Sequence, residues 1–147
     1  MHMLIEYILG VKGEDVVTVA PDTPLQAAAE LMRTNVIGII VVCSYRGRVV
    51  GVLSERDFVR GIAENIESLD EMSVNDLMTP DPITCEPSTD PIDVMITMKQ
   101  KGFRHMPVIN GDVLVGLISI TDLNKFILAE ADISEDWRNR LRRAGVI

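Results

Sequence analysis

The sequence predicts a mixed α/β fold of the α+β type, built from two copies of one β-α-β-β-α unit. The 147-residue chain repeats itself, since segment 18–21 returns at 84–87 and segment 51–58 returns at 116–123. The offset is 66 residues in the first part of the unit and 65 after its central turn. Because the repeat occurs only twice, we expect two half-domains packed with pseudo-two-fold symmetry rather than an open array.

In the first copy, a β-branched run predicts a strand over 16–19 that ends at Ala20-Pro21. A helix is expected over 24–34, because proline suits a first helical turn and apolar residues follow with a period of 3.6. Those apolar residues are Leu25, Ala28, Leu31 and Met32. Two strands over 38–43 and 49–53 and a helix over 55–64 complete the unit.

The second copy repeats this order, with a strand predicted over 83–85 and a helix over 91–101. Strands over 105–109 and 113–118 flank Asn110-Gly111, which is a strong signal for a hairpin turn. A helix over 121–130 closes the unit. The pattern therefore predicts five matching elements in each half.

Segments outside the two copies complete the organisation of the chain. We expect a lead segment over 1–15, the first repeat over 16–64, a connector over 65–81, the second repeat over 82–130 and a C-terminal segment over 131–147. Ser73 is predicted to cap a short helix in the connector. Ser134 is predicted to cap a last helix that stops at Gly145, so short helices are expected near both ends.

Composition excludes several function classes. The net charge of −8 argues against general nucleic-acid binding, which needs clustered lysine and arginine. No apolar run approaches the ~20 residues of a membrane helix, so we expect a cytoplasmic protein with no membrane partner. Cys43 and Cys85 are expected to be buried free thiols, and no metal-ligand cluster stands out. The arginines over 138–143 fit the last turns of a helix.

The sharpest motif is Gly-x-x-Ser-x-x-Asp at a strand-to-helix junction, and it occurs in both copies. Ser54 and Asp57 belong to the first, Ser119 and Asp122 to the second. A helix N-terminus and a serine hydroxyl suit a phosphate, and the carboxylate suits a ribose diol. The same spacing is also a helix-capping signature that needs no ligand. Recurrence at matching positions favours the binding interpretation.

Basic residues provide a second candidate group. Arg104 and His105 precede a buried strand of the second copy, where they could reach a phosphate or pair with carboxylates. Arg56 lies inside the first motif and corresponds to Thr121; it could contact a ligand or lie exposed in the first helical turn. No nucleophile–base pair is visible, so we expect no enzymatic activity.

Together these residues resemble a tandem pair of CBS (cystathionine-β-synthase) domains, called a Bateman module, and in particular small stand-alone CBS proteins. The resemblance rests on Met78-Thr79-Pro80, on segment 104–108 and on both Gly-x-x-Ser-x-x-Asp elements, and it covers 16–130. It implies a cleft between the repeats that binds AMP, ADP or ATP, and in some members NADH or S-adenosylmethionine. It also implies association into a flat homodimer.

The resemblance further implies roles for individual residues. Asp57 and Asp122 would hold ribose, Ser54 and Ser119 phosphate, and Arg104 and His105 would also contact phosphate. The residues that would flank the base are Thr18, Val19, Thr84, Cys85, Ile40 and Met106. The first copy departs from the family pattern, because Val41 replaces proline and the basic pair is missing.

We therefore expect a regulatory adenosine-nucleotide sensor with no required cofactor. Ligand binding would tune a partner protein or an assembly state. The alternative is a ligand-free scaffold dimer whose clefts are vestigial. The unequal basic residues of the two copies predict one dominant nucleotide site per chain.

Overall fold

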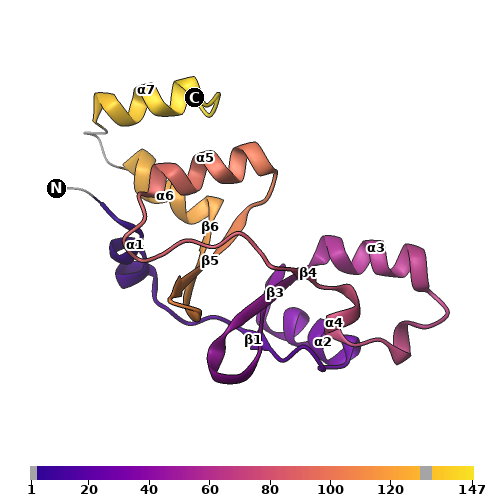
Figure 1. Cartoon of the computed structure of the whole chain (residues 1–147). Helices are drawn as coiled ribbons and strands as arrows, with labels where there is room; N and C mark the ends of the chain where they lie inside the picture. Colours follow the sequence, from indigo (N-terminus) through magenta and orange to yellow (C-terminus); the bar gives the residue numbers. More distant parts are fainter. Residues whose placement is uncertain (1–2, 130–133) are drawn as a thin grey trace. The chain divides into compact units, whose positions relative to one another are not determined.

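A computed structural model of the chain describes residues 3–129 and 134–147, so the predicted helix end at Glu130 lies outside the described residues. The chain divides into two compact units, shown in Figure 1. Unit 1 contains the chain up to residue 14 together with 83–110 and 115–147. Unit 2 contains 15–82 and 111–114. The N-terminal segment thus packs with the second repeat, although it precedes the first.

Unit 2 is built on a four-stranded sheet with the strand order β1-β2-β3-β4. The strands are β1 (Thr18–Val19), β2 (Ile39–Cys43), β3 (Val49–Ser54) and β4 (Thr79–Pro80). The β1–β2 pair is parallel, whereas β2–β3 and β3–β4 are antiparallel. The helices are α2 (Leu25–Asn35), α3 (Glu55–Asn65) and α4 (Val74–Leu77), with short 3-10 turns η1 (Tyr45–Gly47) and η2 (Leu69–Glu71).

The core of unit 2 lies where α2 meets the sheet. Leu25, Ala28 and Met32 are buried on α2, which confirms the predicted apolar period at three of its four positions. Leu31 is 37% exposed instead and lies at the edge of that face. The central strands β2 and β3 contribute Ile40 and Leu53 to this core. The sheet and α2 therefore fix the strand-to-helix junction at which Ser54 and Asp57 lie.

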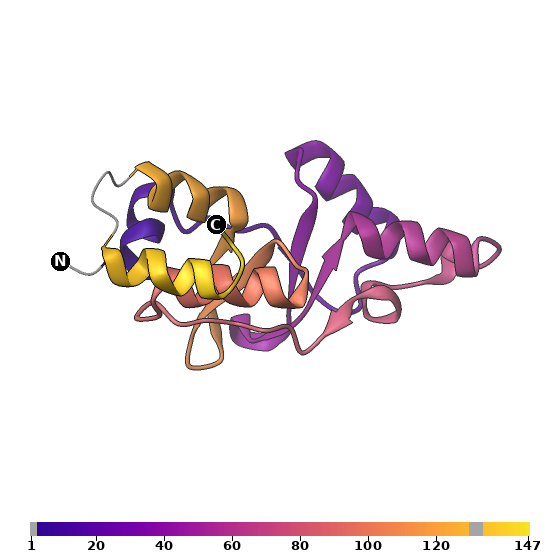
Figure 2. The ribbon, with the colours of Figure 1, turned by 90° about the horizontal axis from the view of Figure 1, so that it is seen from above.

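Within the residues that the structure describes, unit 1 contains a two-stranded sheet and four helices. These elements are α1 (Ile5–Lys12), α5 (Pro91–Lys101), β5 (His105–Asn110), β6 (Val113–Ser119), α6 (Ile120–Ala129) and α7 (Glu135–Arg143). Helix α5 packs on α6, on β5 and on α7, and Figure 2 shows α5 and α7 side by side. Ile5, Ile8 and Leu9 bury one face of α1 in the same core. The N-terminal helix is therefore an integral part of this unit.

The strand predicted over 83–85 is reduced to a single parallel bridge between Cys85 and Val108. Proline explains the difference between the repeats. In unit 2 the Val41 N–H donates to the Val17 carbonyl at 3.4 Å, but the matching residue in the second repeat is Pro107, which has no N–H to donate. The prediction of a full strand was therefore wrong.

The glycines that open both motifs allow another segment to approach closely. A Cβ on Gly51 would lie 2.5 Å from the Met78 sulfur and 3.0 Å from the Thr79 carbonyl oxygen. A Cβ on Gly116 would lie 2.6 Å from a Leu9 methyl. The motif glycine thus leaves room for the Met78 side chain beside β3, where β4 pairs with it in unit 2, and for α1 to pack on β6 in unit 1.

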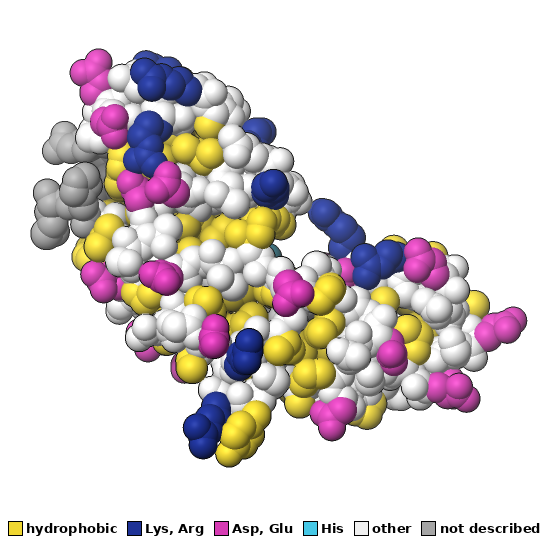
Figure 3. All heavy atoms as spheres, viewed as in Figure 1, with side chains coloured by type: hydrophobic (Ala, Val, Ile, Leu, Met, Phe, Trp, Pro, Cys, Tyr) yellow, Lys and Arg dark blue, Asp and Glu magenta, His cyan; other side chains and the backbone are white. Residues whose placement is uncertain are grey.

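Helix α7 is fixed by an apolar face and an ion-pair cluster. Trp137 and Leu141 are buried, and the Ser134 hydroxyl caps the helix as predicted, accepting from the Trp137 N–H at 3.2 Å. Arg140 pairs with Asp90, at 2.9 Å, and with Asp93. Basic side chains gather over the outer face of α7 in Figure 3. The helix therefore carries a packing role that its dipole alone did not predict.

Two further sequence expectations concern the cysteines and the membrane. Cys43 and Cys85 are free thiols; Cys85 is buried and Cys43 half-buried. Burial raises the pKa of the Cys85 thiol to about 12, which keeps it protonated. Among the helices that the structure describes, none is long and apolar enough to cross a bilayer.

Replacing Val36 by glycine is expected to raise the free energy of unfolding by about 1 kcal/mol. Val36 ends α2 in the left-handed conformation, with φ 53°, while the matching residue that ends α5 is Gly102, with φ 77°. Val36 is 90% exposed, so its side chain contributes little packing. Urea unfolding measures the change. The reverse substitution, Gly102→Val, serves as the control and should destabilise; a stabilising effect there would contradict the strain argument.

Candidate functional site

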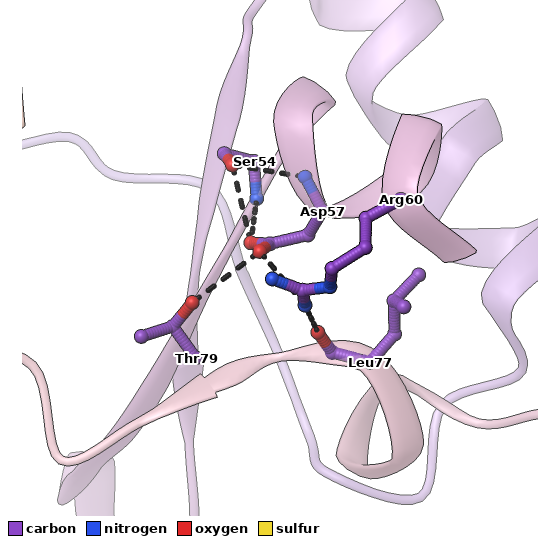
Figure 4. A network of polar contacts seen from close by, with 5 residues as sticks. All are labelled: Ser54, Asp57, Arg60, Leu77 and Thr79. Carbon is purple, nitrogen blue, oxygen red and sulfur yellow. Dashed lines mark hydrogen bonds and ion pairs between the residues drawn. The ribbon is translucent and has the colours of Figure 1, made fainter. Parts of the chain in front are cut away.

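The motif of the first repeat forms a closed polar network at the start of α3 (Figure 4). The Ser54 N–H donates to the Asp57 carboxylate at 2.9 Å, and the Ser54 hydroxyl donates to the same oxygen at 3.1 Å. The Thr79 hydroxyl donates to the other carboxylate oxygen at 3.3 Å, and Arg60 approaches that oxygen at 3.2 Å. Arg60 also donates to the Leu77 carbonyl at 3.1 Å. The network joins α3 to α4 and β4.

These contacts leave Asp57 little capacity for a ligand. Its side chain is only 7% exposed. A carboxylate has about four lone-pair sites, and four donors already point at this one. Because Asp57 is buried and its acceptor sites are occupied, its contacts in this structure stabilise unit 2. Helix capping and the added contacts with Thr79 and Arg60 thus account for the polar groups of the first motif without a ligand.

The motif of the second repeat is more open. The Ser119 N–H donates to the Asp122 carboxylate at 2.9 Å, and the Asp122 N–H donates back to the Ser119 hydroxyl at 3.0 Å. The ammonium of Lys12, at the end of α1, lies 2.5 Å from the same carboxylate and 2.7 Å from the Leu117 carbonyl oxygen. The Asp122 side chain is 22% exposed and that of Lys12 is 28% exposed. Asp122 is therefore accessible and ion-paired.

Lys12 alters the electrostatics of this carboxylate. Burial raises the pKa of Asp122, but the hydrogen bonds from Lys12 and Ser119 together outweigh burial and hold the pKa below its usual value. Asp122 is consequently an anion at neutral pH. An ionised carboxylate accepts hydrogen bonds only, which suits hydroxyl donors such as a ribose diol.

The predicted basic pair lies at the start of β5, next to the point at which α6 begins. Burial, followed by the charge of Lys12, lowers the pKa of His105, with Arg104 adding to the shift and Asp122 opposing it. The Arg104 side chain is exposed, while its carbonyl accepts from the Ile120 N–H at 2.8 Å, where α6 begins. We call Lys12, Arg104, His105, Ser119 and Asp122 the unit 1 half-site.

The remaining predicted site residues lie in different environments. Arg56 and Thr121 are exposed in the first turns of α3 and α6. Thr18 is exposed and Thr84 half-buried. The predicted base-flanking residues with apolar or thiol side chains are buried in the cores of their own units: Val19, Ile40, Cys85 and Met106. Their assignment to an adenine base stays a prediction.

Sequence reasoning missed Lys12, Arg60 and Thr79 as partners of the two motif carboxylates. A signal for Lys12 does exist, because it precedes Thr18 by the same six residues that separate Met78 from Thr84. When the repeat register is extended into the lead segment, Lys12 is therefore equivalent to Met78 of the Met-Thr-Pro segment. That segment pairs with the beginning of the first motif, at Gly51 and Val52.

A shallow groove of about 560 Å³ lies on the helical side of unit 2. Met32, Val36, Ile37 and Phe58 are among its lining residues, and none of the predicted ligand residues is. In the part of the chain that the structure describes, no group of three histidine, cysteine or acidic side chains is placed to hold a metal ion. Apolar side chains dominate the lining, although Arg33 and Glu55 also contribute, so the groove suits a packing surface better than a phosphate.

Comparison with known proteins identifies the fold. The family model of the CBS domain matches residues 11–64 and 74–129. The chain belongs to the CBS-domain family. Its two units are thus built on a pair of CBS repeats, as the sequence predicted.

Solved CBS structures share this architecture. The CBS-domain protein ATU1752 of Agrobacterium tumefaciens is 35% identical, with a TM-score of 0.78, covering 84% of this chain and 98% of that one. CBSX2, solved in complex with AMP, is 25% identical with a TM-score of 0.70, covering 78% of this chain and 89% of that one. These likenesses confirm the predicted mixed fold.

Among curated relatives, a protein encoded in the bps2 3′ region of Acidianus ambivalens is 34% identical over 115 residues, which cover 77% of this chain and 68% of the relative. MJ1225 of Methanocaldococcus jannaschii is 28% identical over 132 residues, covering 90% of this chain. The match spans only 44% of the length of MJ1225.

His105 is expected to titrate below its ordinary pKa of about 6.5. Its folded pKa is lowered by burial and by Lys12 and Arg104, so the unfolded chain binds this proton more readily. The free energy of unfolding should consequently fall as the pH drops below about 6.5 toward the folded pKa. NMR titration of the His105 imidazole measures the pKa. A value above 6.5 would contradict the electrostatic description of the half-site.

Proposed function

We propose that the chain is a regulatory module that binds an adenosine nucleotide and transmits its presence to a partner protein or to an assembly state. The observation that carries the proposal is the unit 1 half-site. There an ionised, partly exposed Asp122 and the Ser119 cap lie at the N-terminus of α6, with Lys12, Arg104 and His105 nearby. A helix N-terminus with added cations suits phosphate, and the carboxylate suits ribose.

The AMP complex of CBSX2 supports the choice of an adenosine ligand. ADP, ATP, NADH and S-adenosylmethionine remain the other members of the expected ligand class. No cofactor is required in this proposal, and the role is regulatory rather than catalytic. Differential affinity of the ligand for two conformations or assembly states would provide the signal.

A ligand panel tests this function. Thermal unfolding is followed with AMP, ATP, NADH and S-adenosylmethionine, and with CMP and UMP as base controls. A ligand that binds only the folded state adds about 2.7 kcal/mol when present at 100 times its Kd, so the binding member should raise the melting temperature. Stabilisation by one or more adenosine ligands, but not by CMP or UMP, supports the proposal. No shift with any adenosine ligand would overturn it.

The scaffold alternative has its own supporting observation. Both motif carboxylates accept hydrogen bonds from the protein itself, and apolar residues lie exposed along α3 and just beyond it: Val59 is 67% exposed, Ile62 47% and Ile66 69%. Spacings of three and four residues put them on one helical face. Together with the apolar groove beside α3, this face supports the predicted homodimer. A failed ligand panel with retained self-association would favour the scaffold.

Light scattering at micromolar concentration is expected to report about twice the 16.3 kDa chain mass. Ile62→Asp places a charge on the apolar face of α3 and should shift the protein toward the monomer. Glu64→Ala, on the same helix, serves as the control. A parent protein that stays monomeric across concentrations would contradict the dimer.

A further inference from the structure

Lys12 is held in place by the packing of α1 rather than by chance contact at the surface. Ile5 and Ile8 are fully buried, and Leu9 lies against Gly116 at the beginning of the second motif. The helix is anchored at its start, where the Ile5 N–H donates to the Thr89 carbonyl at 3.1 Å. Its last residue, Lys12, therefore reaches the junction between β6 and α6.

The ammonium of Lys12 bonds to groups whose counterparts in unit 2 have neutral partners from β4. Leu117 matches Val52, which pairs with Thr79 in the sheet, and Asp122 matches Asp57, which accepts from the Thr79 hydroxyl. The Lys12 ammonium in unit 1 thus bonds to the groups that correspond to the partners of Thr79 in unit 2. Both motif carboxylates thus have a cationic partner, but in unit 1 it is Lys12, which comes from α1, whereas in unit 2 it is Arg60, which lies on α3 itself.

Charges of the half-site are unbalanced. Lys12 and Arg104 are basic side chains, and Asp122 is the carboxylate that Lys12 contacts, while the lowered pKa of His105 favours its neutral form. The Lys12 ammonium bonds to the Leu117 carbonyl and the Arg104 carbonyl accepts from the Ile120 N–H, so both residues lie where β6 meets α6. A ligand entering this region meets a net positive site.

We propose that Lys12 is a specificity-determining residue, which makes the unit 1 half-site select a phosphorylated ribose over a neutral nucleoside. The inference rests on the proposed function. Lys12 and the Ser119 N–H both bond to the same Asp122 oxygen, which leaves the other oxygen to accept from ribose hydroxyls while the ammonium stays beside it. A phosphate supplies the ammonium with a new anionic partner, whereas a neutral nucleoside supplies none. A sulfonium ligand such as S-adenosylmethionine is disfavoured for the same reason.

The test compares two ligands that differ only in their phosphate. Calorimetry with AMP and with adenosine is run on the parent chain and on Lys12→Met, which installs the residue that the connector has at the matching position, Met78. In the parent, AMP is expected to bind about tenfold or more tightly than adenosine, because a charged hydrogen bond to phosphate is replaced by none. In Lys12→Met, the affinity for AMP should fall while the affinity for adenosine stays nearly unchanged, so the ratio falls by about tenfold.

Lys99→Met is the matched control, since Lys99 lies exposed on α5 and the substitution removes the same charge. It should leave the ratio unchanged. A ratio that is the same in Lys12→Met as in the parent would overturn the role of Lys12 while leaving the proposed function intact. Failure of the parent to bind either ligand would instead overturn the proposed function, and with it this inference. An equal fall of the ratio in both variants would show a general charge effect and overturn the inference.

Discussion

Asp57→Ala is expected to lower the free energy of unfolding by about 2–4 kcal/mol, the largest stability effect of any single substitution considered. A buried hydrogen-bonding group that loses its partner costs about 1–3 kcal/mol. The Asp57 carboxylate is the partner of Ser54, Thr79 and Arg60. Its carboxylate also holds α3 against β4, so the loss affects the packing of unit 2. Denaturant unfolding followed by circular dichroism measures the change.

Asp76→Ala is the matched control for that prediction. Asp76 occupies the same capping-box position in α4, where the Ser73 N–H donates to its carboxylate at 2.9 Å, but it is exposed. Losing a cap alone typically costs about 1 kcal/mol. If Asp57→Ala costs no more than Asp76→Ala, the buried network contributes nothing beyond the cap, and Asp57 would again be available as a ligand residue.

Asp122→Ala is expected to weaken nucleotide binding by roughly tenfold or more while the protein stays folded. Hydrogen bonds to a charged acceptor contribute about 1.5–3 kcal/mol, and Asp122 is the accessible carboxylate of the two motifs. Its removal leaves Lys12 able to bond to water, because that side chain is 28% exposed. Calorimetric titration with AMP measures the affinity.

Asp57→Asn provides the comparison for binding, because the amide keeps the side-chain volume and one acceptor oxygen at the buried position, while the charge and the second acceptor oxygen are lost. It should bind AMP like the parent. Equal loss of affinity in Asp57→Asn and Asp122→Ala would contradict the unequal roles given to the two carboxylates, and would favour two ribose-binding half-sites.

The sequence was sufficient for most of the fold because its signals were local. The helix predicted over 91–101 begins at a proline and is followed by Gly102, and the structure has α5 over Pro91–Lys101. The hairpin at Asn110-Gly111 also follows from a turn that needs positive φ, which Gly111 adopts at 64°. The local pattern failed to predict the structure at 83–85, because the strand there depends on a distant residue, Pro107, which has no N–H to donate.

The site was harder to predict because its decisive contacts join distant parts of the chain. Ser54 with Asp57 and Ser119 with Asp122 are visible as patterns three residues long. The pairing of Lys12 with Asp122 spans 110 residues and depends on the packing of α1 in unit 1. The sequence around the motifs does not distinguish the saturated Asp57 from the open Asp122, because a basic residue, Arg60 or Lys125, follows each carboxylate by three positions. The difference comes from distant groups: the Thr79 hydroxyl of β4 donates to Asp57, and the Leu77 carbonyl of α4 accepts from Arg60.

The central claim is that the chain has one dominant adenosine-nucleotide site, built on the unit 1 half-site. Calorimetric titration of the parent chain with AMP, at low and at raised salt, tests it most directly. The account predicts saturable binding near one nucleotide per chain, weakened by salt and by Arg104→Ala, because the phosphate contacts are ionic. Two equal sites that are insensitive to salt, or no binding at all, would contradict it.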